Sequence, residues 1–382
     1  MSDFDIIIIG AGPVGATLAL GSAQYGLRIG ILEARREVEA ADDMRTLALS
    51  YGSQQLLEHL DIWDGVTSST PITSIHISQQ GAWGRSLLRA SEANVPALGY
   101  VLAHHDLQNA LNLKLEQKNI SVLRGARVSR LGNSLTHATV DYTMDGVQFT
   151  ASARLAVVAD GGRTLPDTIK REVRSYEQTA LVANVKTSLP HGNRAFERFT
   201  PEGPVALLPH QQGYALVLTA DPKAIPGLMD LDDHAFLQYL SGHFGGRAGG
   251  FTELSKRLSF NLSLNYAKPT LAERVVLIGN AAQTLHPVAG QGLNLGIRDA
   301  VQLSAHIVAN KNSDLGGATM LETYARSRAG DSRAGILFTD GLVRLFSNDY
   351  PILSGGRAFA LSVLDNLPYA KKWFTRKLMY GI

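Results

Sequence analysis

Three glycines near the N-terminus have the spacing of a turn that binds phosphate. Gly10, Gly12 and Gly15 form the pattern GxGxxG between an apolar run, residues 6–9, and a segment of helical character, residues 14–25. In such a turn the first glycine permits the tight bend, the second lets a pyrophosphate approach the backbone, and the third lets the helix pack on the strand. Free amides and the positive end of the helix dipole then favour the phosphate charge. The pattern predicts a dinucleotide site.

An acidic residue, Glu33, ends the next predicted strand, residues 28–32. A carboxylate at the end of this strand accepts hydrogen bonds from the ribose hydroxyls of a dinucleotide. It favours an unphosphorylated adenosine ribose, and therefore NAD or FAD rather than NADP at this site. Strand, glycine turn, helix and second strand make up the beginning of a βαβ unit, which weighs against a glycine-rich turn without a ligand.

A second motif lies far along the chain, GNAAQTLHPVAGQGLNLGIRD from Gly279 to Asp299. It resembles the second FAD fingerprint of the flavoprotein aromatic hydroxylases (class A monooxygenases), usually written GDAAHxxxPxxGQGxNxGxxDA. The apolar run at 274–278 predicts a strand that delivers Gly279 to the flavin ribityl chain. The turn that follows exposes bare amides, and the helix after it presents its N-terminus. That arrangement would stabilise negative charge on the reduced flavin.

Two positions depart from the fingerprint, since Asn280 replaces an aspartate and Gln283 replaces a histidine. Asn280 can still bond a ribityl hydroxyl. With these residues the motif is similar to the ubiquinone-biosynthesis hydroxylases, most of all the bacterial 2-octaprenyl-6-methoxyphenol hydroxylases. Segments 176–185, 197–209 and 338–349 resemble the same group, and the resemblance covers almost the whole chain. In segment 197–209 the apolar residues fit sheet core and contacts to a substrate ring equally well.

Other positions enter the predicted site through the resemblance. Asp160, in VVADGGRT, matches a family motif that serves FAD and NAD(P)H, but Asp167 stands where the family commonly has an arginine. Arg45 matches an arginine beside the flavin and its phosphate. His105 falls where relatives carry an FAD-contacting arginine, and Gln108 lies one helical turn away. Because a second GxGxxG is absent, the resemblance implies that NADH or NADPH binds transiently at the surface of the flavin domain.

The residues predicted to bind FAD are Gly10, Gly12, Pro13, Gly15, Glu33, Ala34, Arg45, His105, Gln108, Val128, Asp160, Gly279, Asn280, Pro287, Gly290, Gln291, Gly292, Leu293 and Asn294. His286 and Pro287 are the candidates for a catalytic role at the flavin face, although His286 could equally be a packed loop residue. His104, His105 and His210 lack the ligand spacing of zinc or non-haem iron, so no metal is predicted.

The expected architecture is an α/β fold of the p-hydroxybenzoate-hydroxylase type, with a parallel sheet, a β-rich substrate domain and C-terminal helices. We expect a discontinuous FAD-binding domain (1–70, 98–175 and 270–335), a β-rich substrate domain (71–97 and 176–269) and a C-terminal helical segment (336–382). Residues 53–60 are expected to form a helix with Ser53 as its N-cap. The 382 residues, 45% of them hydrophobic, suffice for two joined domains.

Charge and segment composition limit the partners and the location. The formal net charge of +2 gives no argument for nucleic acid. The start, MSDFD, lacks a secretory signal and no apolar run is long enough to cross a membrane, so we expect a cytoplasmic protein. The basic and aromatic tail, residues 370–382, suggests either a packed terminal helix or peripheral contact with the inner membrane or a ubiquinone-biosynthesis complex. An oligomer is compatible with the sequence.

The resemblance implies an NAD(P)H- and O2-dependent monooxygenase that hydroxylates the ring of a prenylated phenol. In that chemistry reduced FAD takes up O2 to form a C4a-hydroperoxide whose distal oxygen is attacked by the ring. The cofactor supplies the reactivity and the protein supplies orientation and electrostatics. The alternatives are a reductase or oxidase of the same fold acting on another apolar substrate, and a flavoprotein subunit without catalytic activity in a biosynthetic complex.

Overall fold

The computed structural model describes residues 2–36, 45–118, 120–286, 290–346 and 351–381. Its first layer is a largely parallel sheet with β1 near the centre, in the order β18-β19-β11-β1-β2-β8. β1 pairs in parallel with both β2 and β11, and β11 pairs in parallel with β19. An antiparallel extension, β9 and β10, continues from β11. The strands of this sheet are β1 (Phe4–Ile9), β2 (Ile29–Glu33), β8 (Ser121–Arg124), β9 (Arg127–Asn133), β10 (Ala138–Met144), β11 (Val147–Val158), β18 (Leu271–Ala272) and β19 (Val275–Leu277).

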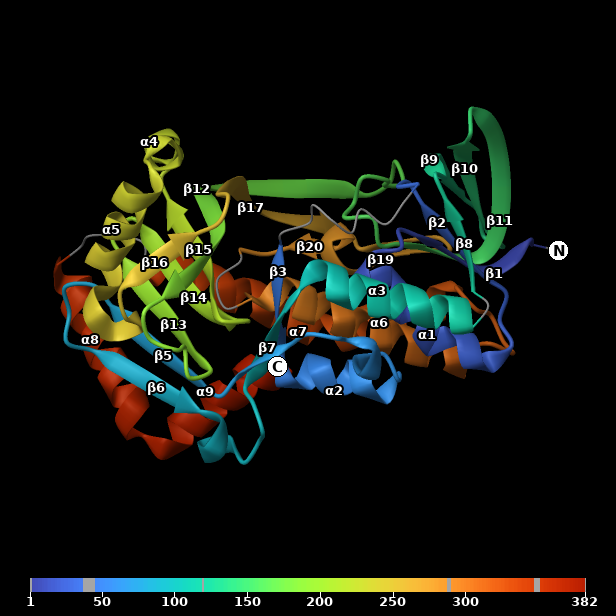
Figure 1. The fold of residues 1–382 in the computed structure, drawn as a ribbon. Coiled ribbons are helices and arrows are strands. Elements are labelled where there is room, and N and C mark those ends of the chain that lie inside the picture. The colour runs from blue at the N-terminus through green and yellow to red at the C-terminus, as the bar shows by residue number, and fades with distance from the viewer. Residues whose placement is uncertain (1, 37–44, 119, 287–289, 347–350, 382) are drawn as a thin grey trace.

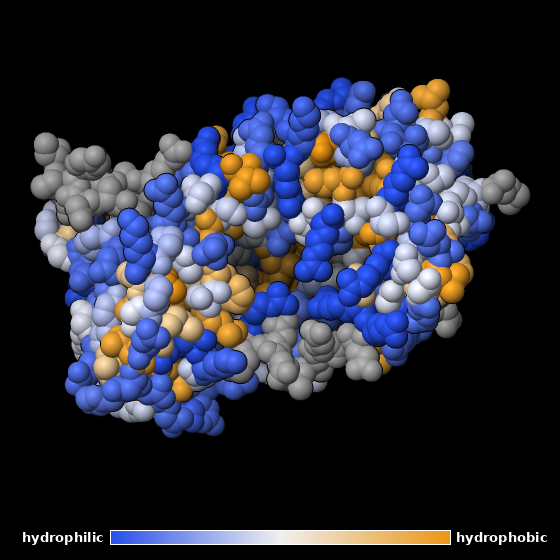
Figure 2. All heavy atoms as spheres, turned by 90° about the horizontal axis from the view of Figure 1, so that it is seen from above, coloured by the Kyte–Doolittle hydropathy of each residue, from blue (hydrophilic) through white to orange (hydrophobic). Residues whose placement is uncertain are grey.

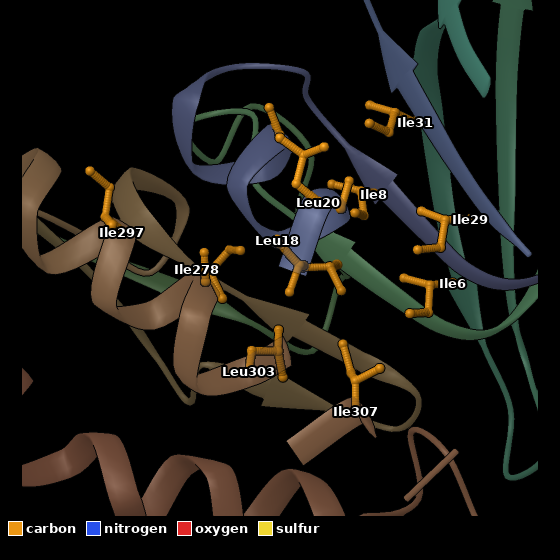
Figure 3. Packing of buried hydrophobic residues seen from close by; sticks show 14 of the residues in the cluster. Ile6, Ile8, Leu18, Leu20, Ile29, Ile31, Ile278, Ile297, Leu303 and Ile307 are labelled. Atoms are coloured by element: carbon orange, nitrogen blue, oxygen red, sulfur yellow. The ribbon is translucent and has the colours of Figure 1, made fainter. Parts of the chain in front are cut away.

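Helices cover one face of the first sheet, below its strands in the view of Figure 1. Ile6 and Ile8 of β1 pack on Leu18 of α1, and α1 in turn contacts Ile297 and Leu303 of α6 (Figure 3). These side chains are fully buried, which is why β1 reads as a continuous apolar run. The helices of this layer are α1 (Pro13–Ser22), α2 (Tyr51–His59), α3 (His104–Gln117), α6 (Gln291–Ala309) and α7 (Ala318–Phe346).

A second, mainly antiparallel sheet forms the other half of the molecule (Figure 1). Its order is β20-β17-β12-β15-β14-β13-β5-β6, with β16 beside β12. The long strands β12 and β17 extend from the region of the first sheet into the second. The strands are β5 (Ser74–Gln79), β6 (Arg85–Arg89), β12 (Lys170–Thr187), β13 (Arg194–Thr200), β14 (Gly203–His210), β15 (Gly213–Ala220), β16 (Phe251–Leu254), β17 (Leu258–Lys268) and β20 (Gln283–Thr284).

The two faces of this second sheet meet different helices. On one face Phe196 and Leu218 pack against Phe236 and Phe244 of α5. On the other face Ile77, Phe199 and residues of α8 and α9 form a separate cluster. Alternate residues of a strand point to opposite faces, so Phe196 and Phe199 serve different cores. The helices here are α4 (Ile225–Asp230), α5 (Asp233–Phe244), α8 (Pro351–Asn366) and α9 (Pro368–Tyr380).

A small third sheet has the strand order β3-β7-β4, and β3 and β7 lie between the two larger sheets (Figure 1). Its strands are β3 (Thr46–Ser50), β4 (Thr70–Ile72) and β7 (Gly99–Ala103), and short 3-10 turns occur at 23–25, 63–65, 90–93, 245–248 and 279–281. The face drawn in Figure 2 is mostly hydrophilic, with hydrophobic residues in small groups. Among the described residues, none of the helices combines the length and apolarity needed to cross a membrane.

The N-cap expected at Ser53 is wrong by three residues. Ser50 is the N-cap, because its side chain accepts a hydrogen bond from the backbone N–H of Ser53 at 3.2 Å. The first turn is held by a tertiary contact, since the rings of Tyr51 and Tyr380 of α9 meet edge to face. The C-terminal segment is thus a packed helix at this end of α2.

Candidate active site

The glycine turn lies between the end of β1 and the start of α1, as the sequence predicts. Gly10 has a φ of +106°, a conformation that only glycine adopts readily, and a Cβ there would press on the carbonyl of Ala159. A Cβ on Gly15 would collide with the carbonyl oxygen of Gly10. At Gly12, the N-cap of α1, a Cβ would meet no described atom within 4 Å. The helix N-terminus beginning at Pro13 is therefore open to an anion.

Glu33 faces this turn from the end of β2. One carboxylate oxygen accepts a hydrogen bond from the Ala11 N–H at 2.8 Å, and the other accepts from the Arg35 N–H at 2.9 Å. Burial would raise the pKa of Glu33, but these hydrogen bonds and the Arg35 charge outweigh it and lower the pKa. The residue is therefore a carboxylate acceptor held beside the phosphate turn.

Backbone contacts place further predicted residues near the end of β2. Ala34 directly follows Glu33, and the Glu33 carbonyl accepts from the N–H of Ala126, which leads into β9. Val128, on that strand, is partly buried against the core on the far side of the first sheet. The adenosine end of a dinucleotide would lie near the end of β2. That Ala34 and Val128 contact it stays a prediction.

The start of α3 supplies a buried amide to the turn. Gln108 donates through Nε2 to the Ala11 carbonyl at 2.9 Å and to Asn112 at 3.2 Å. Its Oε1 is buried and has no hydrogen-bond partner within the described part of the chain. His105, partly exposed, pairs with Asp106 at 3.3 Å. Arg45 is exposed, and its carbonyl accepts from the His104 N–H, which joins the start of β3 to α3.

The second motif meets the first through direct glycine contacts. Gly279 has a φ of +58°, and a Cβ there would lie 3.1 Å from the methyl groups of Val14 in α1. A Cβ at Gly296 of α6 would lie 2.7 Å from the same side chain. The Gly279 N–H donates to Asp299 at 3.1 Å, and Asp299 is also bound by Arg328 at 2.8 Å. Asp299 therefore positions the motif from within and does not face a ligand.

Asp160 shapes a third turn beside the first two. Its carboxylate accepts from the backbone N–H groups of Gly162, Arg163 and Thr164 at 2.8 to 3.1 Å. Sequence reasoning missed Arg171 of β12, whose guanidinium donates to the carbonyls of Gly161 at 2.9 Å and Asn280 at 2.8 Å. A cation thus bridges the two turns although the family arginine position holds Asp167. The pairing of β12 with β17 brings Arg171 here, and no sequence motif marks it.

The N-terminus of α6 is fixed to β3 by one side chain. Asn294 accepts from the Ser50 N–H at 2.8 Å and donates to the carbonyls of Ala48 and Gly290 at 3.0 and 2.6 Å. Gly290 is the N-cap, with Gln291 buried in the first turn and Leu293 partly buried against the core. A Cβ at Gly292 would meet no described atom within 4 Å. Among the described residues, no atom crowds the Gly292 backbone at this helix end.

The two departures and the two catalytic candidates have different surroundings. Asn280 is exposed, whereas Gln283 is buried and donates to Ser332 of α7 at 3.2 Å, away from the glycine turns. His286 is buried with its ring edge-on to Tyr176, and burial lowers its pKa to about 4, so the ring is neutral at pH 7. It does not line the cavity described next. Pro287 lies outside the described residues.

An apolar cavity of about 310 Å³ adjoins the N-terminus of α6. Gly290, Gln291 and Asn294 line one end, and the described parts of α8 and α9 line the other. Between them lies one face of the second sheet, the face opposite to the one that packs against α5. The sheet residues that line it include Ile75, Ile77, Ala195, Glu197, Phe199, Pro204, Ala206, Leu208, Val217 and Thr219. Arg198, by contrast, points to the other face and donates to Ser78 at 3.1 Å.

These features fit FAD as the bound group. Two open helix N-termini, at Gly12 and Gly292, suit phosphate and the flavin carbonyl edge, and the Glu33 carboxylate suits a ribose. The buried Oε1 of Gln108, which has no partner among the described residues, leaves an acceptor for a hydroxyl. The cavity beside α6 leaves room for an apolar substrate. Fold and site together define an FAD-dependent monooxygenase. Among the described residues, no group of three or more His, Asp or Glu could hold a metal ion.

The chain belongs to the FAD binding domain family, whose model matches residues 3–336. It is similar to the ubiquinone hydroxylase UbiL of Rhodospirillum rubrum, at 32% identity over 98% of this chain and 89% of the relative. It is 29% identical to the 3-demethoxyubiquinol 3-hydroxylase of Escherichia coli, over 96% of each chain. The solved structure of the p-nitrophenol 4-monooxygenase PnpA from Pseudomonas putida matches with a TM-score of 0.82 at 16% identity, over 99% and 98% of the two chains. These matches confirm the predicted family and fold.

Proposed function

We propose that this protein hydroxylates the aromatic ring of a polyprenylated phenol in ubiquinone biosynthesis, with NADH or NADPH as reductant and O2 as oxidant. The observation that supports this most is the apolar cavity, which begins at the flavin-side N-terminus of α6 and ends at α8 and α9. Its volume of about 310 Å³ is at the lower end of the roughly 300–1,000 Å³ of ligand pockets. It suits a ring and the first part of a prenyl tail.

The residues that would hold FAD lie on three turns. Gly12 and Pro13 would bind the diphosphate, Glu33 the adenosine ribose, and the turn from Gly279 together with the start of α6 the flavin end. When bound and reduced, FAD activates O2 for transfer of one oxygen atom to the ring. The chain's own contribution is to orient the ring, exclude water through the apolar lining, and hold the turns rigid through Asp299 and Arg171.

The far end of the cavity supports a contact with lipid. Leu361 and Leu364 of α8 and Phe374 of α9 line it. Elsewhere on the same helices Phe359 and Trp373 are both 63% exposed. Exposed aromatic residues beside lysines are typical of helices that lie in a membrane interface, and Lys372 and Lys377 flank Trp373. We propose that α8 and α9 touch the membrane surface from which a prenylated substrate would enter.

Deletion of the gene tests the pathway, and a cavity variant tests the site. Ala206→Phe places a ring in the cavity, and Val173→Phe, at a β12 position that is 66% exposed, is the matched control. The deletion strain should accumulate a prenylphenol seen by mass spectrometry, and Val173→Phe should restore quinone synthesis. Ala206→Phe should bind FAD normally and fail to restore it. Normal quinone levels in the deletion strain would contradict the pathway, and full rescue by Ala206→Phe would contradict the cavity as substrate site.

A further inference from the structure

Among the described residues, one ionisable side chain lines the largely apolar cavity. Glu197 lies in the middle of β13, where its neighbours across the sheet are Ala206 of β14 and Ile77 of β5. Along the strand, Ala195 and Phe199 point to the same face and also line the cavity. The remaining polar lining groups are hydroxyls and amides. Within the described chain, Glu197 is therefore the single group in the cavity lining that can exchange a proton near neutral pH.

The described residues around Glu197 offer its carboxyl no structural partner. Glu197 is half-buried, and among the described residues its carboxyl makes no hydrogen bond and no ion pair, although an apolar lining disfavours a carboxylate without a partner. Neighbouring Arg198 and Arg194 do not line the cavity. Burial raises the pKa of Glu197 to about 7. A group so placed can hold or release a proton at the pH of the cell, which is the property that general acid–base catalysis requires.

We propose that Glu197 is the base that takes the hydroxyl proton of the phenol during ring hydroxylation, an inference that rests on the proposed function. The O–H bond of the phenol breaks, its proton goes to a Glu197 carboxylate oxygen, and the electron pair stays with the ring oxygen. The ring carbon so activated forms a bond to one oxygen atom of O2. That carbon loses its hydrogen as a proton when aromaticity returns, and Glu197 gives its proton back. NAD(P)H supplies the two electrons that reduce the other oxygen atom to water.

The test compares FAD-loaded wild type with Glu197→Gln and Glu197→Asp on a short-chain prenylphenol. A positioned general base contributes about 10²–10⁴-fold, so Glu197→Gln should lower kcat at least 100-fold. Because the carboxylate form predominates above its pKa, wild-type kcat/KM should rise with pH through about 7, and this limb should vanish in Glu197→Gln. Glu197→Asp should keep the limb and restore part of the rate. Glu202→Gln, an exposed position in the same hairpin, is the control expected to match wild type.

A second readout separates proton transfer from folding and packing. The dissociation constant of the substrate's methyl ether, which has no proton to give, should be unchanged in Glu197→Gln, as should FAD content and melting temperature. A Glu197→Gln enzyme with kcat within threefold of wild type and the same pH limb would overturn the inference while leaving the proposed function intact. If Glu197→Gln weakened binding of the methyl ether by the same factor as it lowered kcat, the inference would also be overturned, because Glu197 would then act through packing. A wild-type enzyme that hydroxylates no prenylphenol would overturn both.

Discussion

Changing Gly12 or Gly15 to alanine should have different effects, the first mainly on FAD binding and the second also on the stability of the fold. At Gly12 the backbone has φ −66° and ψ 176°, which any residue adopts, and a Cβ would meet no described atom within 4 Å. The loss of a good N-cap residue costs up to about 1 kcal/mol, and the gain from reduced unfolded-state entropy is about 0.4–1 kcal/mol. Gly12→Ala should therefore change the free energy of unfolding by less than about 0.5 kcal/mol.

The same methyl group has a different effect at Gly15. There it would collide with the Gly10 carbonyl oxygen and lie 3.2 Å from a methyl carbon of Ile8 and 3.3 Å from the Cβ of Ala159. Overpacking of this kind costs about 1–3 kcal/mol, so Gly15→Ala should unfold at clearly lower urea concentration than wild type. Since α1 would have to move away from β1, FAD affinity should fall with it.

The assay measures both properties on the same apoprotein. Urea unfolding gives the stability, and quenching of flavin fluorescence during titration gives the FAD dissociation constant. Gly12→Ala should be as stable as wild type yet bind FAD at least tenfold more weakly, because the added methyl occupies the space through which a diphosphate reaches the amides; tenfold corresponds to about 1.4 kcal/mol. Wild-type FAD affinity in Gly12→Ala would refute the placement of the diphosphate, and wild-type stability in Gly15→Ala would refute the packing argument.

Two further predictions concern buried charge and pH. Asp299→Asn should lower the free energy of unfolding by about 3 kcal/mol, the lower end of the range for breaking a buried pair, because Asp331 still neutralises Arg328 at 2.7 Å. Asp314→Asn breaks a pair of similar length in which the carboxylate is exposed, and Arg274 keeps its hydrogen bonds to two backbone carbonyls. It should therefore cost less than about 1 kcal/mol, and equal effects of the two variants in urea unfolding would contradict the role of burial. Histidine in the unfolded chain has a pKa of about 6.5, whereas burial lowers the pKa of His286 to about 4. The unfolded chain therefore binds a proton more readily, and lowering the pH from about 6.5 to about 4 favours unfolding. Over this range wild type should lose about 3 kcal/mol more of its free energy of unfolding than His286→Phe, at about 1.36 kcal/mol per pKa unit. Parallel stability curves for wild type and His286→Phe would show that the ring is not buried as neutral imidazole.

The features that the sequence could predict are those set by local pattern. β1, α1 and the turn between them follow from an apolar run, three glycines and Glu33 in consecutive order. The start of α2 differs from the prediction, because Ser50 and not Ser53 is the N-cap, and Tyr51 next to it packs on Tyr380 from the far end of the chain. Local residues alone carry no information about such a contact.

The parts that could not be predicted depend on pairing between distant strands. Arg171 reaches the flavin-side turns because the first part of β12, from Lys170 to Val182, pairs with β17. The residues next to Arg171 in sequence give no sign of this pairing. Glu197 lies in a segment that fits core and substrate contacts equally, and its surroundings follow from the register with β5 and β14. In a strand, a shift by one residue moves a side chain to the other face. Which residues of β13 face the cavity could therefore be read only from the structure.

Oxygen labelling of the product tests ring hydroxylation by this protein most directly. Purified protein reconstituted with FAD is supplied with NADPH or NADH, a short-chain prenylphenol and ¹⁸O₂, and the product is analysed by mass spectrometry. A monooxygenase should place one ¹⁸O atom on the ring for each nicotinamide oxidised. Nicotinamide oxidation that yields only labelled hydrogen peroxide and unchanged phenol, under every substrate condition, would contradict a monooxygenase and favour an oxidase of the same fold.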